Sequence, residues 1–264
     1  MNFYWVYDLP NWLFGLLVVA LSVTIGLSGM LVLRSRIRGL HGGHSHNEIV
    51  SVFFASMAVF YGVAVGLFSV GAWQTYTDVE SKVALEAATL ASLYRDVSHF
   101  AEPARSEAQA RLGTYTRNIF DQVWPQQRKG IVTYSNDALL SSFYDTMVNY
   151  EPSTEMQKEV SAESLRQFNR LIELRRLRLQ NVTVGLPRTM WTLVILGAIV
   201  TLASTWFFDV RSLMMHSWLT VLLAILLGMI IHLLAAMDNP FRGDYCVSPK
   251  PFQMVYDDLM APRP

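Results

Sequence analysis

Three groups of side chains in this sequence have types and spacings that could do chemistry. The first is an H-x-x-H-x-H run of His41, His44 and His46, and imidazoles are common metal ligands. Gly42 and Gly43 interrupt this run, and no cysteine or acidic cluster accompanies it. The alternative is a flexible loop whose histidines bind nothing. We favour the loop and expect no metal site.

The second candidate is His232, which lies inside an uncharged apolar stretch. Histidines within a membrane can relay protons or bind substrate. The alternative is a neutral hydrogen-bonding residue near the end of its helix, because Met237, five residues on, ends the apolar stretch. We favour this second interpretation.

The third group pairs a carboxylate with arginines. A seam at 3-4 spacing places Glu86 among apolar residues: Tyr76, Val79, Val83, Leu90, Leu93 and Val97. A second seam carries Arg175 in a core position: Leu165, Phe168, Ile172, Leu179, Val182 and Leu186. A buried carboxylate is costly unless it is paired.

Counting helical rise from Trp73 and from Thr189 puts Glu86 and Arg175 at similar heights, about 20 Å along their helices. We therefore expect Glu86 beside Arg175 or Arg176, with Arg178 in the same cluster, as an ion pair that sets the register of two antiparallel helices. The alternative is that each charge reaches water separately.

No other grouping suggests catalysis. The sequence has no nucleophile–base pair, no Gly-rich phosphate loop and no metal-ligand motif, so we expect no enzyme activity and no cofactor. The formal net charge is zero, which argues against nucleic-acid binding because that needs a basic surface.

The elements that must position these groups are membrane helices. Hydrophobic residues make up 52% of the 264 residues and charged ones 16%, which is too apolar for an ordinary soluble protein. Four uncharged stretches reach the roughly 20 residues that cross a bilayer: Trp12–Leu33, Ile49–Tyr76, Thr189–Phe208 and Ser212–Met237.

The second stretch continues as helix well beyond its apolar part, to about His99. The segment 74–188 holds 14 of the 21 Lys+Arg and 14 of the 21 Asp+Glu. We therefore predict an all-α polytopic membrane protein with four transmembrane helices and a helical extramembrane stalk between helices 2 and 3. The predicted divisions are 1–73, a first transmembrane hairpin; 74–188, the stalk; 189–237, a second hairpin; and 238–264, a tail.

Within the stalk we expect a helix at about 103–124, ended by Pro125 and Gly130. We also expect helices at 135–150 and from a Ser153 or Thr154 cap to Leu186. The tail begins with a turn signal, Pro240-Phe241-Arg242-Gly243, and residues 248–260 could form a short amphipathic helix.

The second stretch also carries a face of small residues, which lets another helix approach closely in lipid. Helix packing and the lining of a pore are both open uses of this face. Its members and near neighbours are the pore-lining candidates: Ser51, Ala55, Ala58, Tyr61, Gly62, Gly66 and Ser69.

The first loop is short and carries Arg34, Arg36 and Arg38, and the second hairpin loop adds Arg211. By the positive-inside rule these loops are cytoplasmic, which places the N-terminus, the stalk and the tail on the extracytoplasmic side. Arginines near 175–188 argue for the opposite orientation.

Several motifs together resemble a bacterial family of bestrophin-like membrane proteins. The motifs are Asn47, Tyr61–Gly66, Trp73, Glu86–Arg95, Tyr115, Trp124, Arg175–Arg178, Trp191 and Pro240–Gly243. The resemblance implies a bacterial inner-membrane protein that forms a homo-oligomer in lipid and passes small inorganic ions, since bestrophins are pentameric anion channels. Bestrophins also bind calcium through an acidic cluster, and no cluster of that type is found here, so calcium activation and an oligomer number are not carried over. The second hypothesis is a non-conducting scaffold or sensor whose stalk binds a partner.

Overall fold

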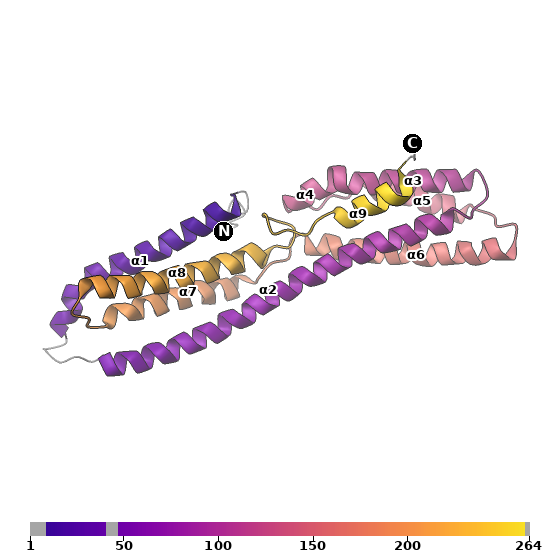
Figure 1. The fold of residues 1–264 in the computed structure, drawn as a ribbon. Coiled ribbons are helices and arrows are strands. Elements are labelled where there is room, and N and C mark those ends of the chain that lie inside the picture. The colour runs from indigo at the N-terminus through magenta and orange to yellow at the C-terminus, as the bar shows by residue number, and fades with distance from the viewer. Residues whose placement is uncertain (1–8, 41–46, 262–264) are drawn as a thin grey trace. The chain divides into compact units, whose positions relative to one another are not determined.

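The fold was analysed in a computed structural model that describes residues 9–40 and 47–261 (Figure 1). The regular elements in these residues are all helical. In chain order they are α1 (Asn11–Leu40), α2 (Asn47–Val97), α3 (Ala104–Asn118), the π-helix η2 (Ile119–Val123), α4 (Trp124–Arg128), α5 (Asp137–Val148), α6 (Glu155–Asn181), α7 (Arg188–Ser204), the 3-10 helix η3 (Thr205–Phe207), α8 (Leu213–Asp238), α9 (Lys250–Val255) and the π-helix η4 (Tyr256–Met260).

Four of these helices are long and apolar enough to cross a membrane: α1, α2, α7 with η3, and α8. They correspond to the four stretches predicted from the sequence. α2 has 51 residues, so it is far longer than a bilayer requires, as its pattern indicated.

The chain divides into two compact units. Unit 1 consists of Met1–Gln74 and Gly185–Asp238, and unit 2 of Thr75–Val184 and Asn239–Pro264. α2 contributes its first half to unit 1 and its second half to unit 2.

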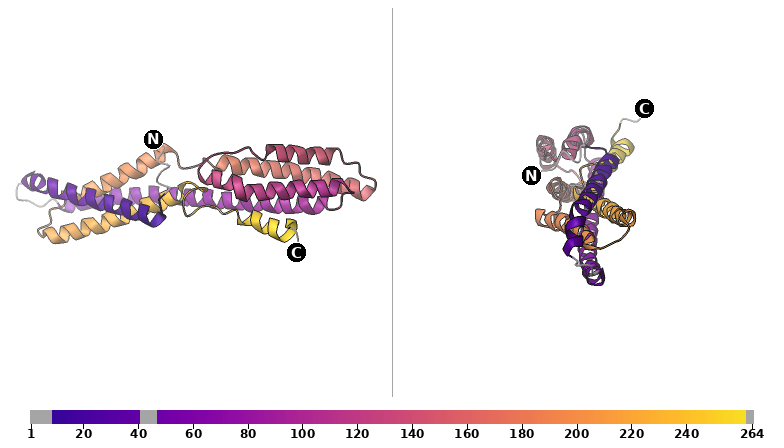
Figure 2. Two further views of the ribbon diagram at one scale, coloured as in Figure 1. Left: turned by 90° about the horizontal axis from the view of Figure 1, so that it is seen from above. Right: turned by 90° about the vertical axis from the view of Figure 1, so that its left-hand side faces the viewer.

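In unit 1, α1 packs closely along α8 (Figure 2). Gly228 of α8 allows this approach, since a Cβ there would lie 2.9 Å from the Cα of Val19. At the end of α7 the indole of Trp206 lies over Gly29 and donates a 3.0 Å hydrogen bond to the carbonyl oxygen of Gly26. Small residues in the first helix therefore serve contacts within the chain.

The core of unit 2 is built on the seam predicted along α2. From Val79 to Val97 every seam position is fully buried, Glu86 included. Of the seam predicted along the return helix, Leu165 and Ile172 are half-buried and pack against the core, whereas the core position predicted for Arg175 is occupied by Arg178. α6 buries a wider face, as expected for a helix that meets several neighbours rather than one partner: Ser164, Phe168, Leu171, Leu174, Arg178 and Leu179.

Two predicted helix ends differ from the structure. Pro125 does not end its helix, which continues through α4 to Arg128. The residues before it form the wider π-helical turn η2, which interrupts the regular hydrogen-bond ladder where a proline would otherwise clash. The return helix stops at Asn181 rather than Leu186, and residues 182–187 are not helical.

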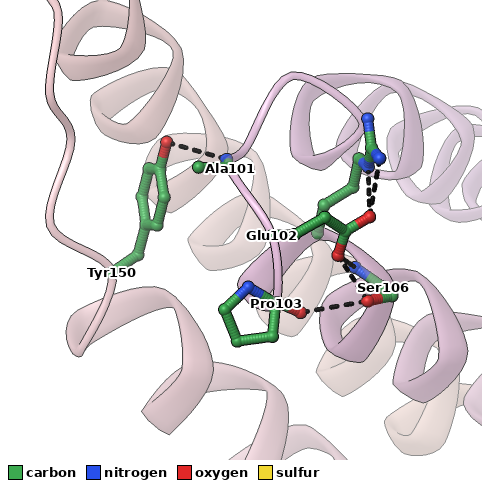
Figure 3. Close-up of polar contacts among 6 residues, drawn as sticks. Ala101, Glu102, Pro103, Ser106 and Tyr150 are labelled. Atoms are coloured by element: carbon green, nitrogen blue, oxygen red, sulfur yellow. Dashed lines mark hydrogen bonds and ion pairs between the residues drawn. The ribbon is translucent and has the colours of Figure 1, made fainter.

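The turn between α2 and α3 is fixed by polar contacts (Figure 3). The Glu102 carboxylate accepts hydrogen bonds from the Ser106 hydroxyl, at 2.5 Å, and from the Ser106 N–H, at 3.2 Å. These bonds, with those from Arg105, hold the pKa of Glu102 below its usual value. The Tyr150 hydroxyl accepts from the N–H of Ala101, which ties the end of α5 to this turn. At the next turn Thr154 caps α6 by accepting from the N–H of Gln157, as predicted.

Candidate functional site

The small-residue face of α2 lies mostly open within unit 1. Ser51, Ala55, Gly62 and Gly66 are exposed, while Ala58 and Ser69 are half-buried. A Cβ placed on Gly62 or Gly66 would meet no other atom within 4 Å. No other part of the described chain therefore packs on this face at the two glycines.

The membrane half of α2 as a whole is poorly covered by its own chain. Only 6% of its apolar 18-residue window is buried, against 11% for α1, 33% for α7 and 39% for α8. Val65 and Ala72 are its buried apolar residues, packed with Val194 of α7 and Leu234 of α8. Such a bare apolar helix requires lipid or other protein around it.

Tyr61 is placed differently from the other pore-lining candidates. Its hydroxyl donates a 3.1 Å hydrogen bond to the carbonyl oxygen of Val194, and its ring occupies the space over Gly197. Tyr61 thus joins α2 to α7 and lies apart from the open glycine face.

The buried charge centre of unit 2 is an ion pair between Glu86 and Arg178. Both side chains are almost fully enclosed, at 0% and 1% exposure. The contact is bidentate: Arg178 Nε donates to Glu86 Oε2 at 2.7 Å and Nη2 donates to Oε1 at 3.0 Å. The remaining Nη1 donates to Gln127 Oε1 at 2.9 Å.

Aromatic rings enclose the same guanidinium. Trp124 of α4 and Phe252 of α9 each lie with their ring centroid 5.7 Å from Arg178 Cζ, which is within cation–π range. Burial alone would lower the pKa of Arg178, but the charge and hydrogen bonds of Glu86 outweigh it and raise that pKa. Burial raises the pKa of the neighbouring Tyr115 phenol, which therefore stays neutral.

The arginine paired with Glu86 is not the one expected. Arg175 instead contacts Asp137 at 2.5 Å, and Arg176 is exposed. The height estimate assumed helix up to Leu186, whereas α6 ends at Asn181, so the helical rise used for residues 182–187 does not apply. The paired position is three residues further along α6 than Arg175.

The predicted turn at Pro240–Gly243 belongs to the core of unit 2. Phe241 is buried with its ring centroid 5.4 Å from that of Trp124. Arg242 Nη2 donates to the carbonyl oxygen of Lys129, and Arg128 Nη2 donates to the carbonyl oxygen of Gly243 at 3.3 Å. Two loops distant in sequence thus each donate an arginine hydrogen bond to the other.

Two glycines make these reciprocal arginine hydrogen bonds possible. Gly130 and Gly243 are the two glycines with positive φ, +72° and +76°, among the described residues. The guanidinium of Arg242 lies directly over Gly130, where a Cβ would collide with it. α9 and η4 then follow and correspond to the tail helix predicted at 248–260. This tail packs in unit 2 through Phe252.

Of the four histidine candidates, the described part of the chain contains His232. His41, His44 and His46 lie outside the described residues. His232 is half-buried, with its ring against Gly15 and Phe14. Among the residues that the structure describes, no cluster of histidine, cysteine and acidic side chains could hold a metal ion.

Asn47 joins the two short loops of unit 1. Its side chain donates to the carbonyl oxygen of Asp209 at 2.9 Å and accepts from the Asp209 N–H at 2.8 Å. Arg34 adds hydrogen bonds to the carbonyl oxygens of Val210 and Arg211.

Comparison with known proteins was made against families and structures. A model of the Bestrophin-like domain matches residues 20–252. A crystal structure of a bacterial Bestrophin homolog from Klebsiella pneumoniae superposes with a TM-score of 0.71 at 10% identity, covering 94% of this chain and 99% of that chain. Two point mutants of that homolog give TM-scores of 0.69 at 11% identity, covering 93% and 97% of the two chains, and 0.66 at 12% identity, covering 94% and 99%. At these identities the structural likeness shows the fold alone. No curated protein matches the chain.

Proposed function

The chain belongs to the Bestrophin-like family, and on that premise we propose that it is an oligomeric membrane channel for small inorganic ions, with anions favoured by the family resemblance. In this proposal α2 lines the path, and residues 74–188 form a helical stalk outside the membrane. The single observation that carries it is the bare membrane half of α2, of whose apolar window only 6% is covered by the chain.

The open face of α2 is suited to packing against copies of itself around a symmetry axis. Copies of α2 can approach closely where Gly62 and Gly66 leave space, since nothing else in the described chain lies within 4 Å of their Cβ positions. The same side chains are uncharged, so an apolar constriction would gate by dewetting rather than by a charged ring.

The test is current across a bilayer that contains purified protein. We expect current from the natural protein and none from Gly62→Trp, because an indole at that position would fill the narrow face. Phe60→Trp is the matched control: it lies two residues away, about 200° round the helix, and is 78% exposed. Its current should match that of the natural protein.

The oligomer is measured in the same preparations. The detergent-solubilised complex should have the mass of three or more copies for the natural protein and for both variants, because fewer copies cannot enclose a central path. A monomer or dimer, or no current over a range of voltage, pH and calcium, would contradict the channel.

The second candidate function is a scaffold or sensor that does not conduct. The observation in its favour is an open groove of about 600 Å³ in unit 2, where Tyr94, Arg117 and Tyr256 lie among the lining residues. A partner bound in this groove would account for an oligomer that passes no ions.

For orientation we propose that the loops closed by Asn47 and Arg34 face the cytoplasm, with unit 2 outside. The basic first loop supports this by the positive-inside rule. A membrane-impermeant maleimide should label Met156→Cys, in a Cys246→Ser background, in intact cells. Labelling only after the cells are broken would reverse the orientation.

A further inference from the structure

We propose that unit 2 contacts the bilayer surface through two loops, and that the partner of these loops is a layer of anionic phospholipid headgroups. The loops are 128–134 and 243–247. Their exposed members form the surface called here the loop surface: Arg128, Lys129, Ile131, Tyr134, Asp244 and Tyr245. The inference requires that α8 crosses a membrane and does not depend on conduction.

The two loops are held together by reciprocal arginine hydrogen bonds. Arg242 bonds the carbonyl oxygen of Lys129 from one side, and Arg128 bonds the carbonyl oxygen of Gly243 from the other. The end of α4 and loop 243–247 lie at the same end of unit 2, while the α5–α6 connection lies at the opposite end (Figure 1). From the end of α4 the chain runs back along the unit to the start of α5, where Asn136 lies beside Asn118.

Chain length brings this end of the unit to the membrane. α8 has 26 residues, so it spans about 39 Å and its last residue, Asp238, reaches the headgroup layer beyond a core of ~30 Å. Arg242 follows Asp238 by four residues, which extend over at most about 14 Å. Because Arg242 is bonded to Lys129, the start of loop 128–134 stays within reach of the headgroups.

The chemistry of the loop surface suits that layer. Ile131 is 51% exposed, and Tyr134 and Tyr245 are each 63% exposed. Tyrosine is enriched at membrane–water interfaces because its ring is apolar and its hydroxyl polar. Arg128 and Lys129 are exposed beside them, with Asp244 as the one acidic residue of both loops. Exposed cations near a membrane surface attract anionic lipid headgroups.

The experiment measures lipid contact by fluorescence. Tyr134→Cys and Tyr245→Cys, each in a Cys246→Ser background, carry an environment-sensitive dye in nanodiscs that contain a headgroup-spin-labelled lipid. Met156→Cys is the control, since it is exposed at the start of α6, 25 residues and about 38 Å along the helix from Asn181. Quenching should be severalfold stronger at positions 134 and 245 than at 156.

The second part of the experiment varies the charge of the lipid. Quenching at position 134 should increase when phosphatidylglycerol replaces part of the phosphatidylcholine, and Lys129→Gln should reduce that increase. Equal quenching at positions 134 and 156 would overturn the proposal. So would dyes at 134 and 245 that are shielded from aqueous iodide but not quenched by lipid, because another protein surface would then cover the loops.

Discussion

Replacing Arg178 with glutamine is expected to lower the free energy of unfolding by about 3–5 kcal/mol. The substitution leaves the Glu86 carboxylate at 0% exposure without its bidentate partner. The protein interior offers no water to solvate that charge, so the full desolvation penalty remains. Denaturant unfolding of the purified protein in one detergent measures the loss.

Arg175→Gln is the matched control for this experiment. Arg175 lies one turn away on α6 and bonds Asp137, whose side chain is 54% exposed. Arg175 itself is 11% exposed, but its replacement leaves only the hydrated Asp137 carboxylate without a partner. Ion pairs with an exposed member contribute roughly 0–1 kcal/mol, so the control should lose much less stability than Arg178→Gln. Equal losses for the two substitutions would show that burial of the Glu86–Arg178 pair has no special energetic role.

Exchanging the two charges distinguishes the loss of the ion pair from the general cost of a core substitution. Glu86→Arg alone places two cations together in the core and should be as damaging as Arg178→Gln. Adding Arg178→Glu should recover part of the loss, because opposite charges then face each other again. Recovery will be incomplete, since Gln127, Trp124 and Phe252 are arranged around a guanidinium at its present position. No recovery at all would contradict a paired interaction.

The buried charges were predictable because they interrupt a strong apolar period. Glu86 stands in a run of valines and leucines at 3-4 spacing, and that spacing fixes which side of α2 faces the core. Its partner could not be fixed to the residue, because the count depended on where the return helix ends. Residues 182–187 leave the helix, and a few non-helical residues shift the register by a turn.

The other partners of Arg178 could not be predicted from the sequence. Trp124 and Gln127 directly follow a π-helical turn, which changes the helical register on which a sequence-based estimate of their direction depends. Phe252 comes from the tail, 74 residues beyond Arg178. The small face of α2 was visible as a pattern, but only the structure shows that α1, α7 and α8 leave it open.

The reciprocal hydrogen bonds of Arg128 and Arg242 lead to a second prediction with a large effect on stability. Gly130→Ala should lower the free energy of unfolding by about 2.5–5 kcal/mol, from two causes. A non-glycine residue at φ +72° costs about 1–2 kcal/mol. The added methyl group also displaces the Arg242 guanidinium from the carbonyl oxygen of Lys129, and losing one charged hydrogen bond costs about 1.5–3 kcal/mol.

Gly113→Ala makes the same chemical change where the structure permits it. Gly113 lies inside α3, and its Cβ would meet no atom within 4 Å. Alanine there should raise the free energy of unfolding by about 0.5–1 kcal/mol, because glycine is the weaker helix former. The two substitutions should therefore change stability in opposite directions when measured in the same detergent. If Gly130→Ala were neutral, the reciprocal hydrogen bonds of Arg128 and Arg242 would not hold the tail, and the tether to the membrane surface would lose its support.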